Sequence, residues 1–541
     1  MNTKERIEHY ENLKSGRANW DTLWREVSTL CHPNYDDVFG TFTAGQKKGL
    51  SVFDGSPIHA NVLLASALHG MLTNPASYWF GLKTGYREID DQDDVRKWLQ
   101  DSAYSIHDTL NSSNFQTEII EVYLALGSIG TWVLYMDEDD ERVVNFSARP
   151  IYQSQIAENK RGEVDEIYRT EKWTKKQLLD KWGKPKPKQP TEWIEKIERK
   201  KDTDEFEVLH SCYPRGGYKD KGLPSEFKFA SCYDLVQEKL PIYESGFHEF
   251  PYAVPRWSKI SGEKYGRSPA MNSLPDIKML QAIMKTQIKG LQKTVDPPLL
   301  VADEGIIGQV KLTPGGTTYV RAGMQNPIVP LQTDSRVDYG FQALAELRTR
   351  IEKAFFIDQL QLKDGPQMTA TEVQRRTEQQ LRLMGPILGR LHHELIRPIV
   401  SRVFAIKLRK GLLPMPIPQI LSKRKLQIQY SSQIAKAQRA GEADDITRGF
   451  GIMAPFLQAQ PGLLDMFNGE MVVKRVARIM DWSEDLIRSK DEFEQIKAQK
   501  QQQMMQQQQM MQEQHEAQVT KDAGPVALEA ARMGQEEMVG Q

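Results

Sequence analysis

The chain has 541 residues, 39% of them hydrophobic and 26% charged, which is enough for about three domains with separate cores. Its 71 basic residues nearly balance its 72 acidic ones, so the net charge argues against a general nucleic-acid-binding protein and leaves room only for a local contact. Three cysteines, no apolar N-terminal leader and no apolar run of about 18 residues predict a soluble intracellular protein without disulfides or membrane spans.

Helical patterns are followed by β patterns in residues 1–268, which predicts an α+β unit. The predicted helices span residues 3–31, 56–75, 91–110 and 115–127. From Thr131 apolar residues alternate, and the predicted strands lie in a hairpin at 131–150, a continuation of the same sheet at 163–173, and segments 206–214, 228–236 and 250–258. A lysine- and proline-rich segment, residues 181–193, is predicted to be a spacer or an exposed loop.

Two helices of similar length, residues 273–295 and 335–356, bracket a small β-rich insertion. Apolar residues of the first helix recur every three or four positions and form a stripe about 80° wide. They are Ile277, Leu280, Met284, Ile288, Leu291 and Val295. The apolar side of the second helix consists of Val337, Phe341, Leu344, Leu347, Ile351 and Phe355. This arrangement predicts an antiparallel stalk with a β-containing tip.

A second stripe on the first stalk helix is cationic and lies roughly 115° from the apolar one. It consists of Lys278, Lys285, Lys289 and Lys293. The sequence leaves two interpretations open, a solvated helix face or a wall that faces a polyanion.

Residues 369–411 predict one long helix interrupted by a proline. Thr369 and Glu372 form a capping box, in which each side chain accepts a hydrogen bond from the other residue's backbone amide. Pro386 lacks an amide and crowds the carbonyl four residues earlier, so we expect a kink near Gly385. At roughly 60 Å the helix would exceed the width of an ordinary domain, which indicates a strut.

The C-terminal part is again helical, with short helices predicted within residues 442–460 and 469–482. A capping box at Ser489 and Glu492 opens a last helix, which runs into a glutamine- and methionine-rich segment. That segment has little to bury by itself, so it is either a solvent-exposed end or a coil that assembles with copies of itself.

No segment has the spacing of a catalytic or metal-binding motif. Residues 40–49 imitate a phosphate-binding loop, but Gln46 stands where the lysine should be and no Ser or Thr follows. The acidic clusters 90–94 and 137–141 fall at a helix start and a hairpin turn, which favours solvated surface over a two-metal nuclease site. The histidine pair 392–393 lacks the spacing of a zinc helix. We therefore predict no catalytic residue, no metal and no cofactor.

Several long strings of this sequence resemble the portal, or head-to-tail connecting, proteins of short-tailed bacteriophages. They are "LHGMLTNPASYWFGL" (68–82), "GEKYGRSPAMNSLPDIKMLQ" (262–281), "FFIDQL" (355–360), "PQMTATEVQRRTEQQLRLMGPILGRLHHELIRPIV" (366–400) and "RVFAI" (402–406). The strings occur in order along the chain, and the residues beyond them match less specifically.

The resemblance implies an α+β, mainly helical portal fold. Its parts would be a wing (1–268), a first stem helix (269–296), a clip (297–333), a second stem helix (334–356), a channel loop (357–368), a long kinked wing helix (369–411), a return segment of the wing (412–432), crown helices (433–500) and a glutamine- and methionine-rich tail (501–541).

The resemblance also implies a non-enzymatic protein that forms a dodecameric ring at one capsid vertex, through which double-stranded DNA is packaged and ejected. The implied partners are other copies of the chain, DNA without sequence preference, the terminase packaging motor, tail adaptor proteins, and the major capsid and scaffolding proteins, but no membrane. The protein would assemble in the host cytoplasm and reside in the virion. The four stripe lysines would line the channel, with Lys363 of the loop as a further candidate.

Two other interpretations remain open. A coiled-coil scaffolding or internal virion protein is favoured only by the glutamine-rich tail and predicts extended dimers or fibres. A DNA-processing nuclease or ATPase predicts magnesium-dependent turnover, and the missing phosphate loop argues against it.

Overall fold

The structure is a computed structural model that describes residues 1–35, 47–90, 92–184, 189–216, 227–301, 306–310, 317–320, 323, 328–331, 337–360, 384–421, 427–430, 446–455, 469–479, 492–511 and 513. The chain divides into two compact units. The first comprises residues 1–83, 100–416 and 426–435, and the second comprises residues 84–99, 417–425 and 436–541.

The N-terminus of the first unit contains two helices, where the sequence predicted one. Helix α1 (Thr3–Ser15) and helix α2 (Ala18–Cys31) are separated at Gly16 and Arg17. The Arg17 side chain is buried at this break and donates hydrogen bonds to three backbone carbonyls of residues 151–154. The prediction of a single helix was wrong because this long-range anchor leaves no mark in the local periodicity.

Three further helices precede the sheets. They are α3 (Ser56–Leu72), α5 (Asp93–Ser112), which belongs in part to each unit, and α6 (Phe115–Ser128). Helix α3 packs against α6. These helices confirm the predictions for this region. Helices α3 and α6 approach closely at Gly127, where an added Cβ would lie 2.1 Å from the Asn61 side-chain oxygen. Asn61 donates a hydrogen bond to the Leu124 carbonyl at the same crossing.

Two antiparallel sheets follow. The hairpin of β2 (Val133–Asp139) and β3 (Val143–Arg149) is confirmed, and the short strand β9 (Tyr252–Ala253) completes a sheet of order β3-β2-β9. The second sheet has the order β4-β5-β6-β7-β8. Its strands are β4 (Ser154–Glu158), β5 (Val164–Thr174), β6 (Glu205–Pro214), β7 (Phe229–Leu235) and β8 (Leu240–Phe247).

Two details of the predicted sheet were wrong. Residues 163–173 do not continue the hairpin's sheet, because β9 occupies the free edge of β2 and β5 pairs with β4 and β6 instead. The strand predicted at 250–258 has only two paired residues, since Pro251 and Pro255 on either side have no amide to donate.

The segment predicted as an exposed loop ends in helices. Helix α7 (Lys175–Trp182) enters it and helix α8 (Glu192–Glu198) leaves it, while 185–188 lie outside the described residues. Trp193 is fully buried and packs with Trp182 in a cluster against the five-stranded sheet. The loop prediction was therefore wrong at both ends. It was based on the lysine- and proline-rich composition and did not take into account the two tryptophans, which are buried in the core. Elsewhere in this unit, the short 3-10 helix η2 (Ile151–Gln153) directly precedes strand β4.

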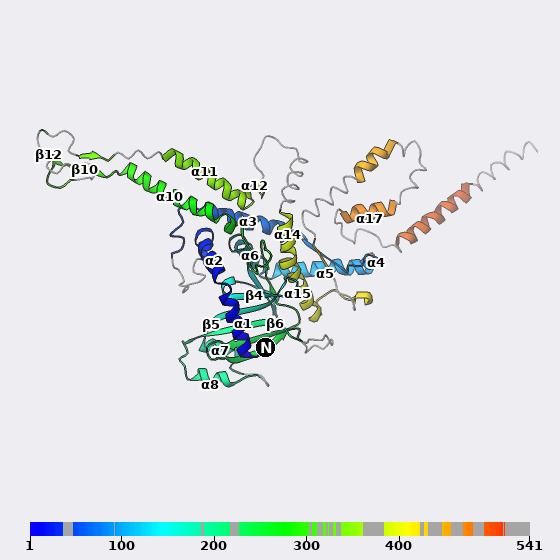
Figure 1. The fold of residues 1–541 in the computed structure, drawn as a ribbon. Helices are drawn as coiled ribbons and strands as arrows, with labels where there is room; N and C mark the ends of the chain where they lie inside the picture. The colour runs from blue at the N-terminus through cyan, green and yellow to red at the C-terminus, as the bar shows by residue number, and fades with distance from the viewer. Residues whose placement is uncertain are drawn as a thin grey trace, which may run out of the picture. The chain divides into compact units, whose positions relative to one another are not determined.

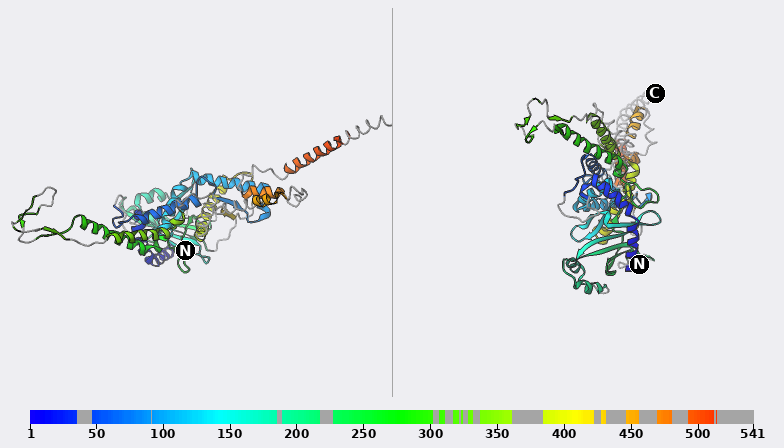
Figure 2. Two further views of the ribbon diagram at one scale, coloured as in Figure 1. Left: turned by 90° about the horizontal axis from the view of Figure 1, so that it is seen from above. Right: turned by 60° about the vertical axis from the view of Figure 1, so that its left-hand side comes forward.

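The predicted pair of stalk helices is present. After α9 (Pro269–Asn272) come α10 (Leu274–Val295) and α11 (Val337–Ala354), which lie side by side (Figures 1 and 2) and are followed by α12 (Ile357–Leu360). Two small two-stranded antiparallel sheets form the β insertion. Strand β10 (Leu299–Val301) pairs with β13 (Ile328–Pro330), and β11 (Ile306–Ile307) pairs with β12 (Tyr319–Val320). Asp296 caps the C-terminus of α10, and Pro297 and Pro298 follow it.

The long helix is irregular at a place that the sequence analysis did not identify. It runs through α14 (Gly385–Leu391), the π-helix η3 (His392–Ile396) and α15 (Arg397–Arg409). Pro386 lies in the first turn of α14, after the N-cap Met384. The residues before Met384, 361–383, lie outside the described residues, so the kink near Gly385 stays a prediction. Pro398, two residues after the π-turn, has no amide to donate to the carbonyl of Glu394 within it. Lys363, Thr369 and Glu372 lie outside the described residues.

Strand β14 (Gln427–Tyr430), within the predicted return segment, pairs with β1 (Phe80–Lys83). The second unit contains α4 (Arg87–Asp90), the 3-10 helix η4 (Gln419–Leu421), α17 (Gly469–Ile479), and helical residues 446–455 and 492–511. Helix α17 and the helical residues 446–455 and 492–511 agree with the predicted helices, whereas α4 and η4 were not predicted. Ser489 lies outside the described residues. Within the described ranges, no helix is long and apolar enough to cross a membrane.

Candidate functional site

Helix α10 carries both predicted stripes, and its two halves differ in burial. In the proximal half Ile277 and Leu280 are fully buried and Gln281 is nearly so. In the distal half Leu291 is 41% exposed and Val295 is 85% exposed. The apolar stripe predicted from the sequence is therefore covered by the chain itself only in its proximal half.

The proximal half is fixed by hydrogen bonds to the segment before α3. The Gln281 side-chain oxygen accepts from the backbone amides of Phe53, at 2.7 Å, and Asp54, at 2.9 Å. Its side-chain nitrogen donates to the Asp54 carbonyl at 2.7 Å. One buried amide side chain thus satisfies three backbone groups of the segment.

The Asp54 carboxylate connects α3 and α11. One oxygen accepts from the backbone amide of Ser56, at the start of α3, at 2.8 Å. The other accepts from Arg348 of α11, at 3.0 Å from Nε and 2.8 Å from Nη2. Burial alone would raise the pKa of Asp54, but the hydrogen bonds from Ser56 and Arg348 outweigh it and hold that pKa below its ordinary value. We call Asp54, Gln281 and Arg348 the stem anchor.

Two of the four stripe lysines are engaged within the chain. Lys278 forms an ion pair with Glu26 of α2, with 2.6 Å between Nζ and the carboxylate. The Nζ atom of Lys285 lies 5.4 Å from the centre of the Phe53 ring, within the range of a cation–π contact. Lys278 therefore faces α2, and Lys285 faces the residue that precedes Asp54.

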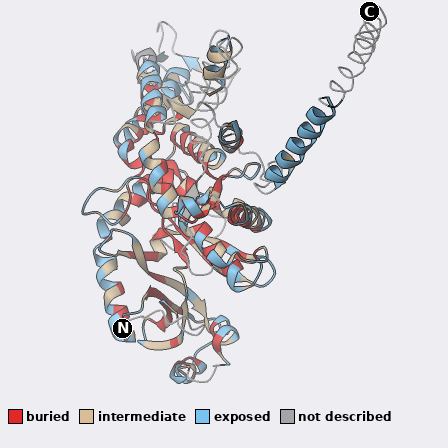
Figure 3. Ribbon diagram, turned by 90° about the vertical axis from the view of Figure 1, so that its right-hand side faces the viewer, coloured by how far each residue is buried: buried red, intermediate tan, exposed pale blue. Residues whose placement is uncertain are grey.

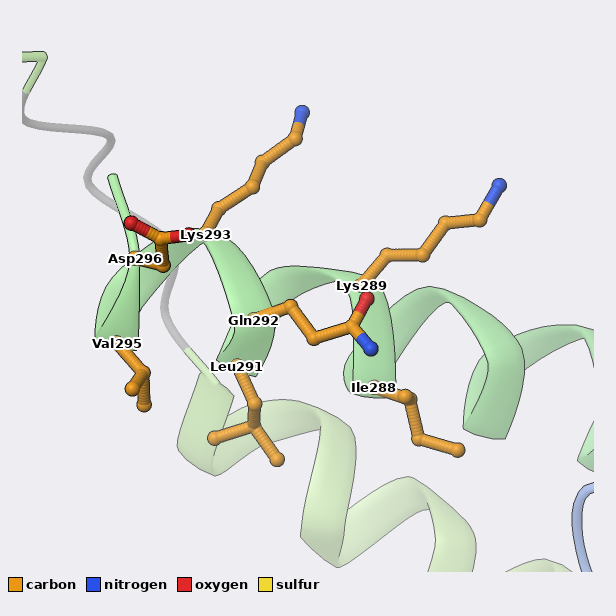
Figure 4. A pocket seen from close by; sticks show the side chains of 7 residues that line it. All are labelled: Ile288, Lys289, Leu291, Gln292, Lys293, Val295 and Asp296. Atoms are coloured by element: carbon orange, nitrogen blue, oxygen red, sulfur yellow. The ribbon is translucent and has the colours of Figure 1, made fainter. Parts of the chain in front are cut away.

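The other two stripe lysines, Lys289 and Lys293, form no ion pair with a described residue. Figure 4 shows both side chains extending from one side of α10. Ile288, Leu291 and Val295 extend from the opposite side. All five line an open groove at the distal end of the helix.

A second junction, missed in the sequence, holds the π-turn. Arg256 is almost fully buried, and its guanidinium donates to both carboxylate oxygens of Glu394, at 2.6 and 3.1 Å. The backbone amide of Arg256 donates to Glu394 as well, at 3.0 Å, and Glu158 of β4 is a further ion-pair partner. No spacing marks this cluster in the sequence, since Glu158 and Glu394 lie 98 and 138 residues from Arg256.

Two acidic groups also fix α15 to the sheet region. Glu249 accepts from the buried Arg402 at 2.7 Å and from Arg409 at 2.6 Å, and Glu138 accepts from Arg409 at 2.6 Å. The acidic cluster 137–141 is therefore partly used in ion pairs, so the solvated-surface interpretation was incomplete. Within the described ranges, no group of three His, Cys, Asp or Glu side chains could hold a metal ion.

Comparison with known proteins gives one consistent result. The family model described as "Bacteriophage head to tail connecting protein" matches residues 3–487. A probable portal protein of Bordetella phage BPP-1 is 27% identical over 491 residues, which cover 89% of this chain and 88% of the relative. The portal protein of Salmonella phage epsilon15 is 27% identical over 517 residues, 92% of this chain and 91% of the relative. The portal protein of Enterobacteria phage T3 is 24% identical over 218 residues, 39% of this chain and 40% of the relative.

Proposed function

The chain belongs to the bacteriophage head to tail connecting protein family, and on that premise we propose how its elements build a portal. It is a phage portal protein, a structural component of the virion at the junction of head and tail. The match over residues 3–487 is the observation that carries this assignment. We propose that copies close into a dodecameric ring around a passage for double-stranded DNA, without enzymatic activity of their own.

The exposed apolar side chains of the stalk support a ring. Large hydrophobic residues at least 40% exposed gather on distal α10, on α11 and in the β insertion. They are Leu291, Val295, Leu300, Val301, Ile307, Tyr319, Val320, Val329, Leu331 and Phe341. A single copy leaves them in water, whereas copies arranged side by side about a symmetry axis cover them. In this proposal α10 and α11 form the stem, and the β insertion within 297–333 forms the clip that meets the packaging motor and the tail.

DNA that slides through a channel requires contacts without sequence preference, which basic side chains make with phosphates. Each chain has a net charge of −1, yet a ring repeats every local cation around its axis. In this proposal Lys289 and Lys293 face the passage, because neither pairs with a described residue. Lys278 and Lys285 instead hold the stem to the rest of the subunit through Glu26 and Phe53.

The remaining parts follow the predicted order. Residues 1–268 form the wing, the helix through η3 crosses it, residues 412–432 return to it, and residues 433–500 form a crown inside the head. Lys363, in the predicted channel loop, stays a candidate for DNA contact. The partners proposed for the assembled ring are the terminase motor, tail adaptors, and the capsid and scaffolding proteins.

Electron microscopy of the purified full-length chain in negative stain tests the proposal. We expect closed rings with a central hole. Filaments or extended dimers would favour the scaffolding interpretation, and monomers alone at micromolar concentration would contradict the ring.

A further inference from the structure

The helix formed by residues 492–511 has an apolar stripe that the described part of the chain does not cover. Figure 3 draws this helix almost entirely as exposed, in pale blue. Its large apolar residues are 43% (Phe493), 62% (Met504) and 72% (Met511) exposed. A helix of this length with one unburied face is marginally stable in water, so a partner for that face would stabilise it.

Four apolar residues of this helix share one stripe with two polar residues. At about 100° per residue, one stripe about 80° wide contains Phe493, Ile496, Lys500, Met504, Gln507 and Met511. Their successive spacings are three, four, four, three and four, a pattern that lets helices pack with little or right-handed supercoiling. Met505 lies about 120° from Phe493, outside the stripe.

The charges of this helix permit packing against identical helices. Between Lys500 and Glu513 no residue is charged, so two parallel copies do not repel each other there. Before Lys500 the helix carries two glutamates, Glu492 and Glu494, and a further lysine, Lys497, so its two signs are balanced. Polar Lys500 and Gln507 within the stripe can fix the register of a small bundle, as single polar core positions do in coiled coils.

We propose that the 492–511 helices of neighbouring subunits pack in parallel through this stripe, as two- or three-stranded bundles. This inference rests on the proposed ring, in which cyclic symmetry points all copies in one direction and holds them at an effective concentration of roughly millimolar. A stripe about 80° wide suits a small bundle, because in a closed tube each helix would need two separate faces.

Cysteine cross-linking in the full-length chain tests this packing. The native thiols Cys31, Cys212 and Cys232 are all buried, so an added surface cysteine is the reactive one. We expect Met504→Cys and Met511→Cys, both in the stripe, to form intersubunit disulfides under mild copper-catalysed oxidation. The matched control Met505→Cys lies outside the stripe and should react roughly tenfold more slowly.

The outcomes separate this inference from the proposed function. Equal cross-linking rates for Met504→Cys and Met505→Cys, or no cross-linking of either, would overturn the packing. Micrographs of the same samples show whether the proposed ring also fails. Rings without stripe-specific cross-links would leave the portal intact and remove the bundles, whereas samples without rings would contradict the portal proposal itself.

Discussion

The two halves of α10 belong to one helix with one repeating pattern, yet they have opposite environments. Around Leu280 and Gln281 the chain covers the apolar stripe and satisfies the polar groups beside it. Around Leu291 and Val295 the same pattern faces solvent. The difference teaches that periodicity specifies which face of a helix is apolar but not what covers it. In this protein we attribute the proximal cover to the subunit's own fold and the distal cover to neighbouring subunits.

The largest expected effect on stability is that of Leu280→Ala in the proximal half of α10, and Leu291→Ala in the distal half is its matched comparison. Leu280→Ala removes a fully buried side chain and should lower the free energy of unfolding by about 2–5 kcal/mol. Leu291→Ala, on the same helix, should change the stability of an isolated subunit by less than about 0.5 kcal/mol and weaken ring assembly instead. Urea unfolding of dilute, monomeric subunits and sedimentation of concentrated samples measure the two effects. Similar destabilisation of the monomer by both variants would contradict the comparison.

The stem anchor should contribute the next largest effect. Asp54→Asn keeps the size of the side chain but removes the charge that Arg348 binds, so we expect a loss of about 1.5–3 kcal/mol in the free energy of unfolding. Arg350→Gln is the matched control, because Arg350 lies on the same helix and pairs with Glu346 in an exposed ion pair. That pair should contribute no more than about 0.5 kcal/mol. Equal losses in the two variants would show that the anchor is no stronger than a surface pair.

Low pH should remove the contribution of Asp54 to the free energy of unfolding. The pKa of Asp54 is lowered in the folded protein, so the folded state binds a proton at this group less readily than the unfolded state. Its stabilising contribution is therefore present above the unfolded pKa, at about pH 3.9, and is lost as the pH falls through the folded value. The stability difference between the wild type and Asp54→Asn should be constant near neutral pH and shrink below about pH 4. A difference that grows on acidification would mean that the sign is wrong.

The sequence predicted the elements of the stem well, because their signals are local. The apolar spacing from Ile277 to Val295 identified α10. The stem anchor could not be predicted in this way. Gln281 and Arg348 lie 227 and 294 residues from Asp54, and a single sequence has no signal that joins them.

The errors elsewhere have the same origin. The break in the N-terminal helix at Arg17 depends on carbonyls of residues 151–154, and the change of sheet at β5 depends on β9 pairing with β2. The π-turn is a different case, since Pro398 was a visible local signal. Pro386 occupies the first turn of α14, where a proline leaves no hydrogen bond of the helix unmade.

The smallest expected effect on stability, and the most specific test of the comparison, concerns the lysines. Lys289→Gln with Lys293→Gln should leave the unfolding free energy unchanged and reduce the salt dependence of DNA binding by the assembled ring. Each lost phosphate contact lowers the slope of log affinity against log salt by about 0.9. Lys278→Gln with Lys285→Gln should keep that slope and cost up to about 1 kcal/mol of stability per lost contact, because these side chains bind Glu26 and Phe53. Fluorescence anisotropy with a short duplex across a salt series measures the slope. If Lys278→Gln with Lys285→Gln reduces the slope as much as the distal pair of substitutions, all four lysines face DNA. The difference between the two halves of α10 would then hold for burial but not for the role of the lysines.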